Sequence, residues 1–64
     1  MSGSYDYRIA EQIHHSRPPL DALIMAAMMG ADTENAARLR TAFPDLAAET
    51  EARYNAPGGI LPND

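Results

Sequence analysis

Residues 18–43 read PPLDALIMAAMMGADTENAARLRTAF, and this stretch decides the fold. It carries most of the large aliphatic and sulfur side chains of the 64-residue chain and divides at Gly30 into two segments. In both segments the apolar residues recur every three or four positions, which is the spacing of one buried helix face. The side chains on these faces form the predicted core: Leu20, Leu23, Ile24, Ala27, Met28, Leu39 and Phe43.

Prolines, one glycine and one aspartate mark the ends of the predicted helices. Pro18 and Pro19 close a first helix and open a second, since proline suits the first turn of a helix but not its interior. Gly30 is expected to end the second helix in the left-handed conformation after the C-cap, and Asp32 to cap a third helix. Pro44 then separates the third helix from a fourth.

The sequence outside residues 18–43 adds two weaker helices and a tail. Tyr5, Ile9 and Ile13 recur every four residues and form a narrow apolar stripe on the first helix. The fourth helix presents an inward face through Leu46 or Ala47, Thr50 and Tyr54, and Ile9, Ile13, Leu46 and Tyr54 are expected to close the sides of the core.

We therefore predict an all-α fold, a small single domain of three to four short helices. It has a helical hairpin at Gly30 and a flexible Pro/Gly C-terminal tail. The expected helices cover residues 5–16, 19–29, 33–43 and 45–55, with tails at residues 1–4 and 56–64.

Composition limits the classes of function. Five arginines, no lysine and nine carboxylates give a net charge of -4, which argues against general attachment to nucleic acid or anionic lipid. The chain has no cysteine, so disulfides and thiolate metal sites are excluded. No apolar stretch reaches the length of a membrane span and the N-terminus lacks a signal-peptide pattern, so we expect a soluble, cytoplasmic protein.

The methionines of the second helix indicate an interaction surface. After Asp21 this helix is apolar nearly all round until Asp32, so another molecule or the rest of the chain must cover it. Methionine adapts to irregular partner surfaces, and a 64-residue domain buries only about 60% of its unfolded surface, so a partner would add needed stability. The predicted interface residues are Leu20, Ile24, Met25, Met28 and Met29.

The second and third predicted helices also resemble the DNA-binding helix-turn-helix pattern, over about 20 residues. The resemblance rests on small and apolar residues around the turn and on the inner helix face, namely Ala26, Gly30, Ala31, Thr33, Ala36 and Leu39. It implies a recognition helix over residues 32–41, in which Asn and Arg read bases in the major groove. The DNA-binding residues of this alternative are Thr33, Asn35, Arg38, Arg40 and Thr41. A plain helical hairpin explains the same residues without DNA.

We expect no enzyme, cofactor, metal site or small-molecule substrate. His14 and His15 are adjacent and point about 100° apart on a helix, so they are poorly placed to chelate one ion. No catalytic residue is assigned, because no carboxylate pair or activated nucleophile stands out.

The leading hypothesis is a small non-enzymatic interaction protein, of the phage or mobile-element accessory type, that docks its Met-containing helix on a protein partner or on itself. The alternative is a helix-turn-helix DNA-binding regulator. A third reading takes the acidic side chains as a mimic of nucleic acid; these are Asp32, Glu34, Asp45, Glu49 and Glu51.

Overall fold

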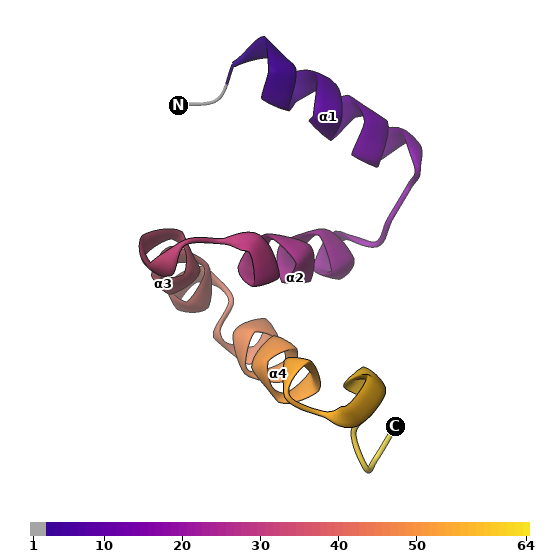
Figure 1. The fold of residues 1–64 in the computed structure, drawn as a ribbon, viewed down its shortest axis with the longest axis vertical. Helices are drawn as coiled ribbons and strands as arrows, with labels where there is room; N and C mark the ends of the chain where they lie inside the picture. The colour runs from indigo at the N-terminus through magenta and orange to yellow at the C-terminus, as the bar shows by residue number, and fades with distance from the viewer. Residues whose placement is uncertain (1–2) are drawn as a thin grey trace.

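A computed structural model describes residues 3–64 and shows an all-α chain, which confirms the predicted fold class. Its four α-helices are α1 (Ser4–His15), α2 (Leu20–Gly30), α3 (Thr33–Ala42) and α4 (Pro44–Tyr54), followed by a short 3-10 helix, η1 (Pro57–Gly59) (Figure 1). Each α-helix begins and ends within one residue of its predicted bounds. Part of the expected N-terminal tail, Met1 and Ser2, lies outside the described residues.

The turn between α2 and α3 differs from the expectation for Gly30. Gly30 is the last residue of α2, and among the described glycines the positive φ angles belong to Gly58 and Gly59. Ala31 instead leaves the helix in an extended conformation, with φ -78° and ψ 149°. Asp32 follows as N-cap of α3, and its carboxylate accepts a 2.8 Å hydrogen bond from the backbone N–H of Asn35. The predicted cap is thus confirmed. The left-handed glycine is wrong because Gly30 stays within α2 as its last residue, and extended Ala31 and Asp32 make the turn.

Close packing involves the last three α-helices. Helix α4 approaches α2, α3 and η1, and α2 approaches α3. The described chain has no Cα atom of α1 within 8 Å of a Cα atom of another helix. Figure 1 accordingly shows α1 as a separate arm beyond α2.

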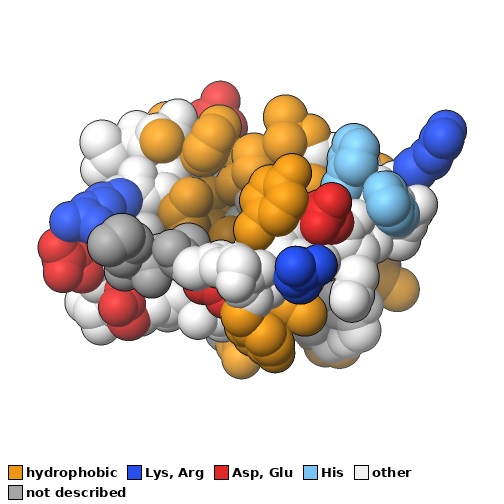
Figure 2. Space-filling view, turned by 90° about the horizontal axis from the view of Figure 1, so that it is seen from above, with side chains coloured by type: hydrophobic (Ala, Val, Ile, Leu, Met, Phe, Trp, Pro, Cys, Tyr) orange, Lys and Arg blue, Asp and Glu red, His pale blue; other side chains and the backbone are white. Residues whose placement is uncertain are grey.

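The predicted core is not buried. Within residues 3–64 no hydrophobic side chain is buried, and the one buried residue is Thr50 on α4, which is 8% exposed. Half-buried side chains are Ile24, Met25, Met28, Leu39 and Leu46, whereas the remaining large members of the predicted core and its sides are exposed: Ile9, Ile13, Leu20, Leu23, Phe43 and Tyr54. Hydrophobic side chains accordingly lie open on the face shown in Figure 2. In this open arrangement most apolar helix faces are only partly covered by another helix, because the helices are short and few of them pack together.

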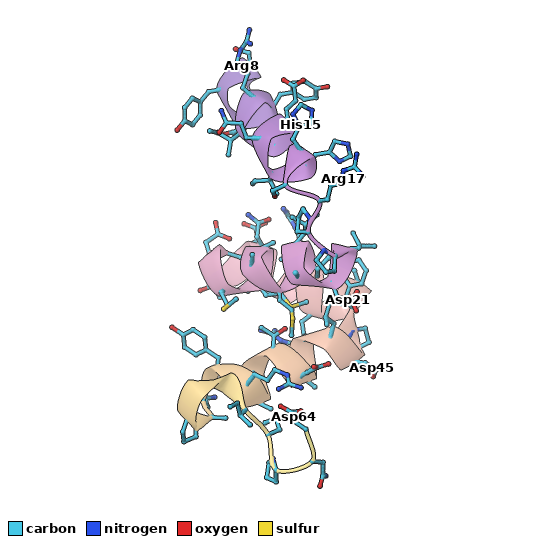
Figure 3. The ribbon with its side chains drawn as sticks, turned by 90° about the vertical axis from the view of Figure 1, so that its right-hand side faces the viewer. Arg8, His15, Arg17, Asp21, Asp45 and Asp64 are labelled. Carbon is cyan, nitrogen blue, oxygen red and sulfur yellow. The ribbon has the colours of Figure 1, made fainter. Side chains whose placement is uncertain are left out.

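The open arrangement also shows in the dimensions. The radius of gyration is 13.3 Å, against about 11 Å for a compact domain of this length. The longest axis measures 41 Å, and α1, α2 and α4 follow one another along it in two views at right angles (Figures 1 and 3). Helices α1 and α4 therefore lie on opposite sides of α2.

The link between α1 and α2 is short and conformationally restricted. Arg17 has a φ of 55°, a left-handed conformation that costs a non-glycine residue about 1 kcal/mol. Its N–H bonds to the carbonyl of His14, but Pro18 has no N–H to complete the usual helix-ending pair of bonds. The Ser16 hydroxyl serves instead, donating a 2.6 Å bond to the carbonyl of Ile13. Pro18 and Pro19 then fix an extended entry into α2.

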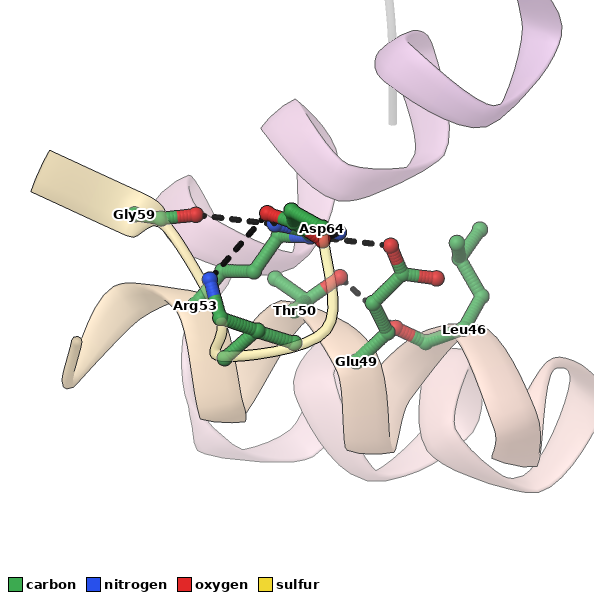
Figure 4. Close-up of polar contacts among 7 residues, drawn as sticks. Leu46, Glu49, Thr50, Arg53, Gly59 and Asp64 are labelled. Carbon is green, nitrogen blue, oxygen red and sulfur yellow. Dashed lines mark hydrogen bonds and ion pairs between the residues drawn. The ribbon is translucent and has the colours of Figure 1, made fainter.

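The C-terminal tail, expected to be flexible, is held against α4 by Arg53 (Figure 4). The Arg53 guanidinium donates two hydrogen bonds to the carboxylate of Asp64, at 2.6 and 2.8 Å, and one of 2.9 Å to the carbonyl of Gly59. A further bond of 2.9 Å goes to Glu49, one turn earlier on α4. This contact was not predicted, because residues 53 and 64 lie eleven positions apart across a turn.

Replacing Asp32 by alanine tests the cap of α3. The variant should lower the free energy of unfolding by about 1 kcal/mol, because the N–H of Asn35 loses its acceptor. Urea unfolding followed by far-UV circular dichroism measures the change. Asp32→Asn is the control and should stay near the original stability, since its amide oxygen can accept the same bond. Equal losses in both variants would contradict the assignment.

The tail contact should depend on pH. The hydrogen bond from Arg53, helped by one from the N–H of Leu61, lowers the pKa of Asp64 from 3.8 to about 2. Because the folded-state pKa is depressed, the stabilisation is fully present above pH 3.8 and is lost as the pH falls through about 2. NMR signals of Gly59 and Leu61 should report release of the tail in that window. In Asp64→Asn the same signals should be released already at neutral pH, and an unchanged position in that variant would contradict the contact.

Candidate functional site

A hollow between α2, α3 and α4 is the main candidate site. Its volume is about 350 Å³, and all three helices contribute to its lining: Met28, Met29, Ala36, Arg40, Ala47, Thr50, Glu51 and Tyr54. The α4 residues among these recur at positions 47, 50, 51 and 54, so they share one helix face. This is the face that the sequence predicted to point inward through Ala47, Thr50 and Tyr54.

Small side chains explain why a hollow forms at this place. Ala36 of α3 and Ala47 of α4 project only a methyl group, so the three helices meet without filling the space between them. The Thr50 hydroxyl donates a 2.7 Å bond to the carbonyl of Leu46 in its own helix and so satisfies its polar group. The wall at this point is therefore effectively apolar.

The rim of the hollow combines apolar and charged groups. Met29 is 58% exposed and Tyr54 is 73% exposed, so both present large apolar surfaces to an occupant. Arg40 comes from α3 and Glu51 from α4, and neither forms an ion pair with another described residue. The site thus offers an apolar floor with one positive and one negative side chain at its edge.

The structure divides the predicted interface residues into two groups. Met28 and Met29 lie together in the hollow. Leu20 lies ten residues from Gly30 at the other end of α2 and is 69% exposed, while Ile24 and Met25 are half-buried and do not line the hollow. Sequence reasoning found the methionines but missed Arg40, Ala47 and Glu51 as members of the same site, since their proximity depends on how α4 packs.

The residues of the DNA-binding alternative are partly occupied with one another. Arg38 donates a 2.6 Å bond to the carboxylate of Glu34 and a 3.3 Å bond to the side-chain oxygen of Asn35. The Thr41 hydroxyl donates to the carbonyl of Ala37, at 3.0 Å. The two side chains expected to read bases therefore bond along α3.

Arg40 and Thr33, the other residues of this alternative, lie elsewhere. Arg40 lines the hollow with the methionines, away from the exposed row of Arg38 and Asn35. Thr33 is the exposed first residue of α3. All five residues of this alternative therefore lie on α3. Arg40, however, lines the hollow and does not share the surface of Asn35 and Arg38.

Several acidic side chains of the mimic hypothesis have local partners. Glu34 pairs with Arg38, Glu49 pairs with Arg53, and the Asp32 carboxylate caps α3. Asp45 lies in the first turn of α4, and Glu51 lies at the hollow. Three of the five carboxylates of the mimic hypothesis therefore have partners within their own helix.

Residues 3–64 contain neither a metal-binding cluster nor a helix that could span a membrane. The ring centroids of His14 and His15 are 5.9 Å apart, and residues 3–64 contain no group of three or more side chains placed to bind a metal ion. Within the same residues, no helix has the length and apolar character needed to cross a bilayer.

Comparison of the chain with protein families, with curated proteins and with solved structures finds no match in any of the three. The hollow and the exposed helices are therefore the structural features that bear on function.

Proposed function

We propose that the chain is a small non-enzymatic interaction protein, which docks the Met-containing surface of α2 and the adjoining hollow on a protein partner or on a second copy. The observation that carries the proposal is the hollow lined by Met28 and Met29, with exposed Tyr54 beside it. Exposed apolar patches on a soluble chain mark binding surfaces, and methionine side chains adapt to the shape of a partner.

The distribution of apolar surface supports docking over catalysis. Leu20, Met29 and Tyr54 are each more than half exposed, so they would lose contact with water on binding. Burial of apolar surface contributes roughly 25 cal/mol for each Å². An apolar surface of this kind, with few polar groups, favours a protein occupant over a small polar substrate.

The helix-turn-helix alternative has weaker support. A DNA-reading helix needs free donors, whereas Arg38 is engaged by Glu34 and Asn35, and the chain carries a net charge of -4. The small accessory role, of the kind found in phages and mobile elements, and a cytoplasmic location are part of the proposal and rest on size and composition.

Photo-crosslinking tests the docking surface. A photoreactive residue placed at Leu20 or Met29, in the cells that naturally make the chain, should yield a defined covalent adduct, because both positions are exposed on α2. Ala52 is the control: it is exposed, and helical spacing puts it on the side of α4 opposite the hollow. Adducts of equal yield at all three positions, or none at the α2 positions, would count against the proposal.

NMR with a DNA duplex separates the alternative. We expect the amide signals of residues 32–41 to stay unchanged when a mixed-sequence duplex is added at low salt, because Glu34 neutralises Arg38. Shifts confined to these residues that fade as salt rises would favour DNA binding instead. In that case Arg38→Ala should weaken binding by about 1–3 kcal/mol at one base position.

A further inference from the structure

The arm formed by α1 has an apolar stripe without a helix partner in its own chain. Tyr5, Ile9 and Ile13 lie along one side of α1 and are all exposed, and the described part of α1 approaches no other helix at the level of Cα atoms. Arg8 lies to one side of this stripe, and Figure 3 shows its side chain pointing away from α2. A helix with this pattern is stable in water only when its stripe is covered.

The amount of exposed surface indicates how large the missing cover is. The chain exposes 5421 Å², whereas a folded monomer of 6.9 kDa is expected to expose about 4,000 Å². The excess is about 1,400 Å² for each chain, or about 2,800 Å² for two. Obligate dimer interfaces bury roughly 2,000–5,000 Å² in total, so a second copy can account for the whole excess.

We infer that two copies of the chain exchange their arms, so that the α1 stripe of each copy lies in the hollow between α2, α3 and α4 of the other. This inference rests on the proposed function and names the occupant of its docking surface. Each hollow would then be lined by three helices of one copy and occupied by α1 of the other. A two-fold axis would relate the two copies.

The dimensions of arm and hollow agree. The stripe from Tyr5 to Ile13 covers eight residue-to-residue steps, or about 12 Å of helix, and the α4 wall from Ala47 to Tyr54 spans about 10 Å. Three apolar side chains at i, i+4 and i+8 are the anchors with which a helix occupies an apolar groove. Met28 and Met29 on the opposite wall can adjust to their shape.

The charges also match. The hollow has Arg40 and Glu51 at its edge, both without ion pairs among the described residues. The α1 stripe has Asp6 on one side and Arg8 on the other, and these two are equally unpaired within residues 3–64. Asp6 can therefore pair with Arg40, and Arg8 with Glu51. Two such pairs would fix which way α1 runs along the hollow.

The arm cannot reach the hollow of its own chain. Helices α1 and α4 lie on opposite sides of α2, and the link consists of residues 16–19 with two consecutive prolines. Four residues span at most about 14 Å, too little to carry α1 around α2 to the far wall. A short, stiff hinge of this kind favours exchange between copies over closure within one.

Light scattering on the full chain gives the first part of the test. The expected mass is about 13.8 kDa, twice the 6.9 kDa of one chain. Ile9→Asp should weaken dimerisation by on the order of 100-fold or more, because a two-fold dimer contains the affected contact twice. Glu11→Gln is the matched control on the opposite face of α1 and should leave the mass unchanged.

Crosslinking gives the second part and is clean because the described chain has no cysteine. Two variants, Ile9→Cys and Met29→Cys, carry tags of different size and are mixed with a short bismaleimide. A crosslinked heterodimer is expected, and a mixture of Glu11→Cys with Met29→Cys should give markedly less product.

Two outcomes would overturn the arm exchange. A dimer that crosslinks through Ile9→Cys alone, without Met29→Cys, would place stripe against stripe. A strict monomer without crosslinks would remove the second copy altogether. In either case, an adduct from Leu20 or Met29 to a different protein in cells would leave the proposed docking function standing. Absence of any such adduct would reject both the arm exchange and the docking function.

Discussion

Contact of α4 with α2, α3 and η1 is the interaction on which the rest of the structure depends. Thr50 lies where these helices meet and is the one buried residue among those described. Its hydroxyl bonds to the carbonyl of Leu46, so a polar side chain can occupy the centre without an unpaired group. Ala47 of α4 and Ala36 of α3 let the helices approach but leave the hollow unfilled. One helix thus both holds the body together and creates its candidate binding site.

The sequence predicted the helices well because their ends depend on local chemistry. Pro18, Pro19 and Pro44 restrict the backbone wherever they occur, and Asp32 caps the residue three positions ahead of it. These effects need no knowledge of distant residues. Gly30 was the exception, since it stays helical as the last residue of α2 and extended Ala31 and Asp32 make the turn. The methionine interface stays a prediction; it too comes from local sequence, because the apolar character of a helix can be recognised from its own residues.

Packing between helices could not be predicted in the same way. The sequence indicated a core around α2 and α3, yet Leu20 and Phe43 are exposed, at 69% and 41%. Spacing shows which face of a helix is apolar but not whether a second helix covers it. Arg40 illustrates the same limit at the site, since it was grouped with Arg38 on a DNA-reading helix and instead lies beside the methionines. The contact between Arg53 and Asp64 was missed because it depends on the turn at residues 55–59.

A chain whose hydrophobic side chains all stay in contact with water, within residues 3–64, has an unusual thermodynamic profile. The heat-capacity change of unfolding grows with the apolar surface newly exposed. Here much of that surface is already hydrated in the folded chain, so the heat-capacity change is small and the stability varies little between cold and warm conditions. A partner that covers the apolar surface would raise the heat-capacity change of unfolding. It would also raise the free energy of unfolding, and this effect would grow with the partner's concentration.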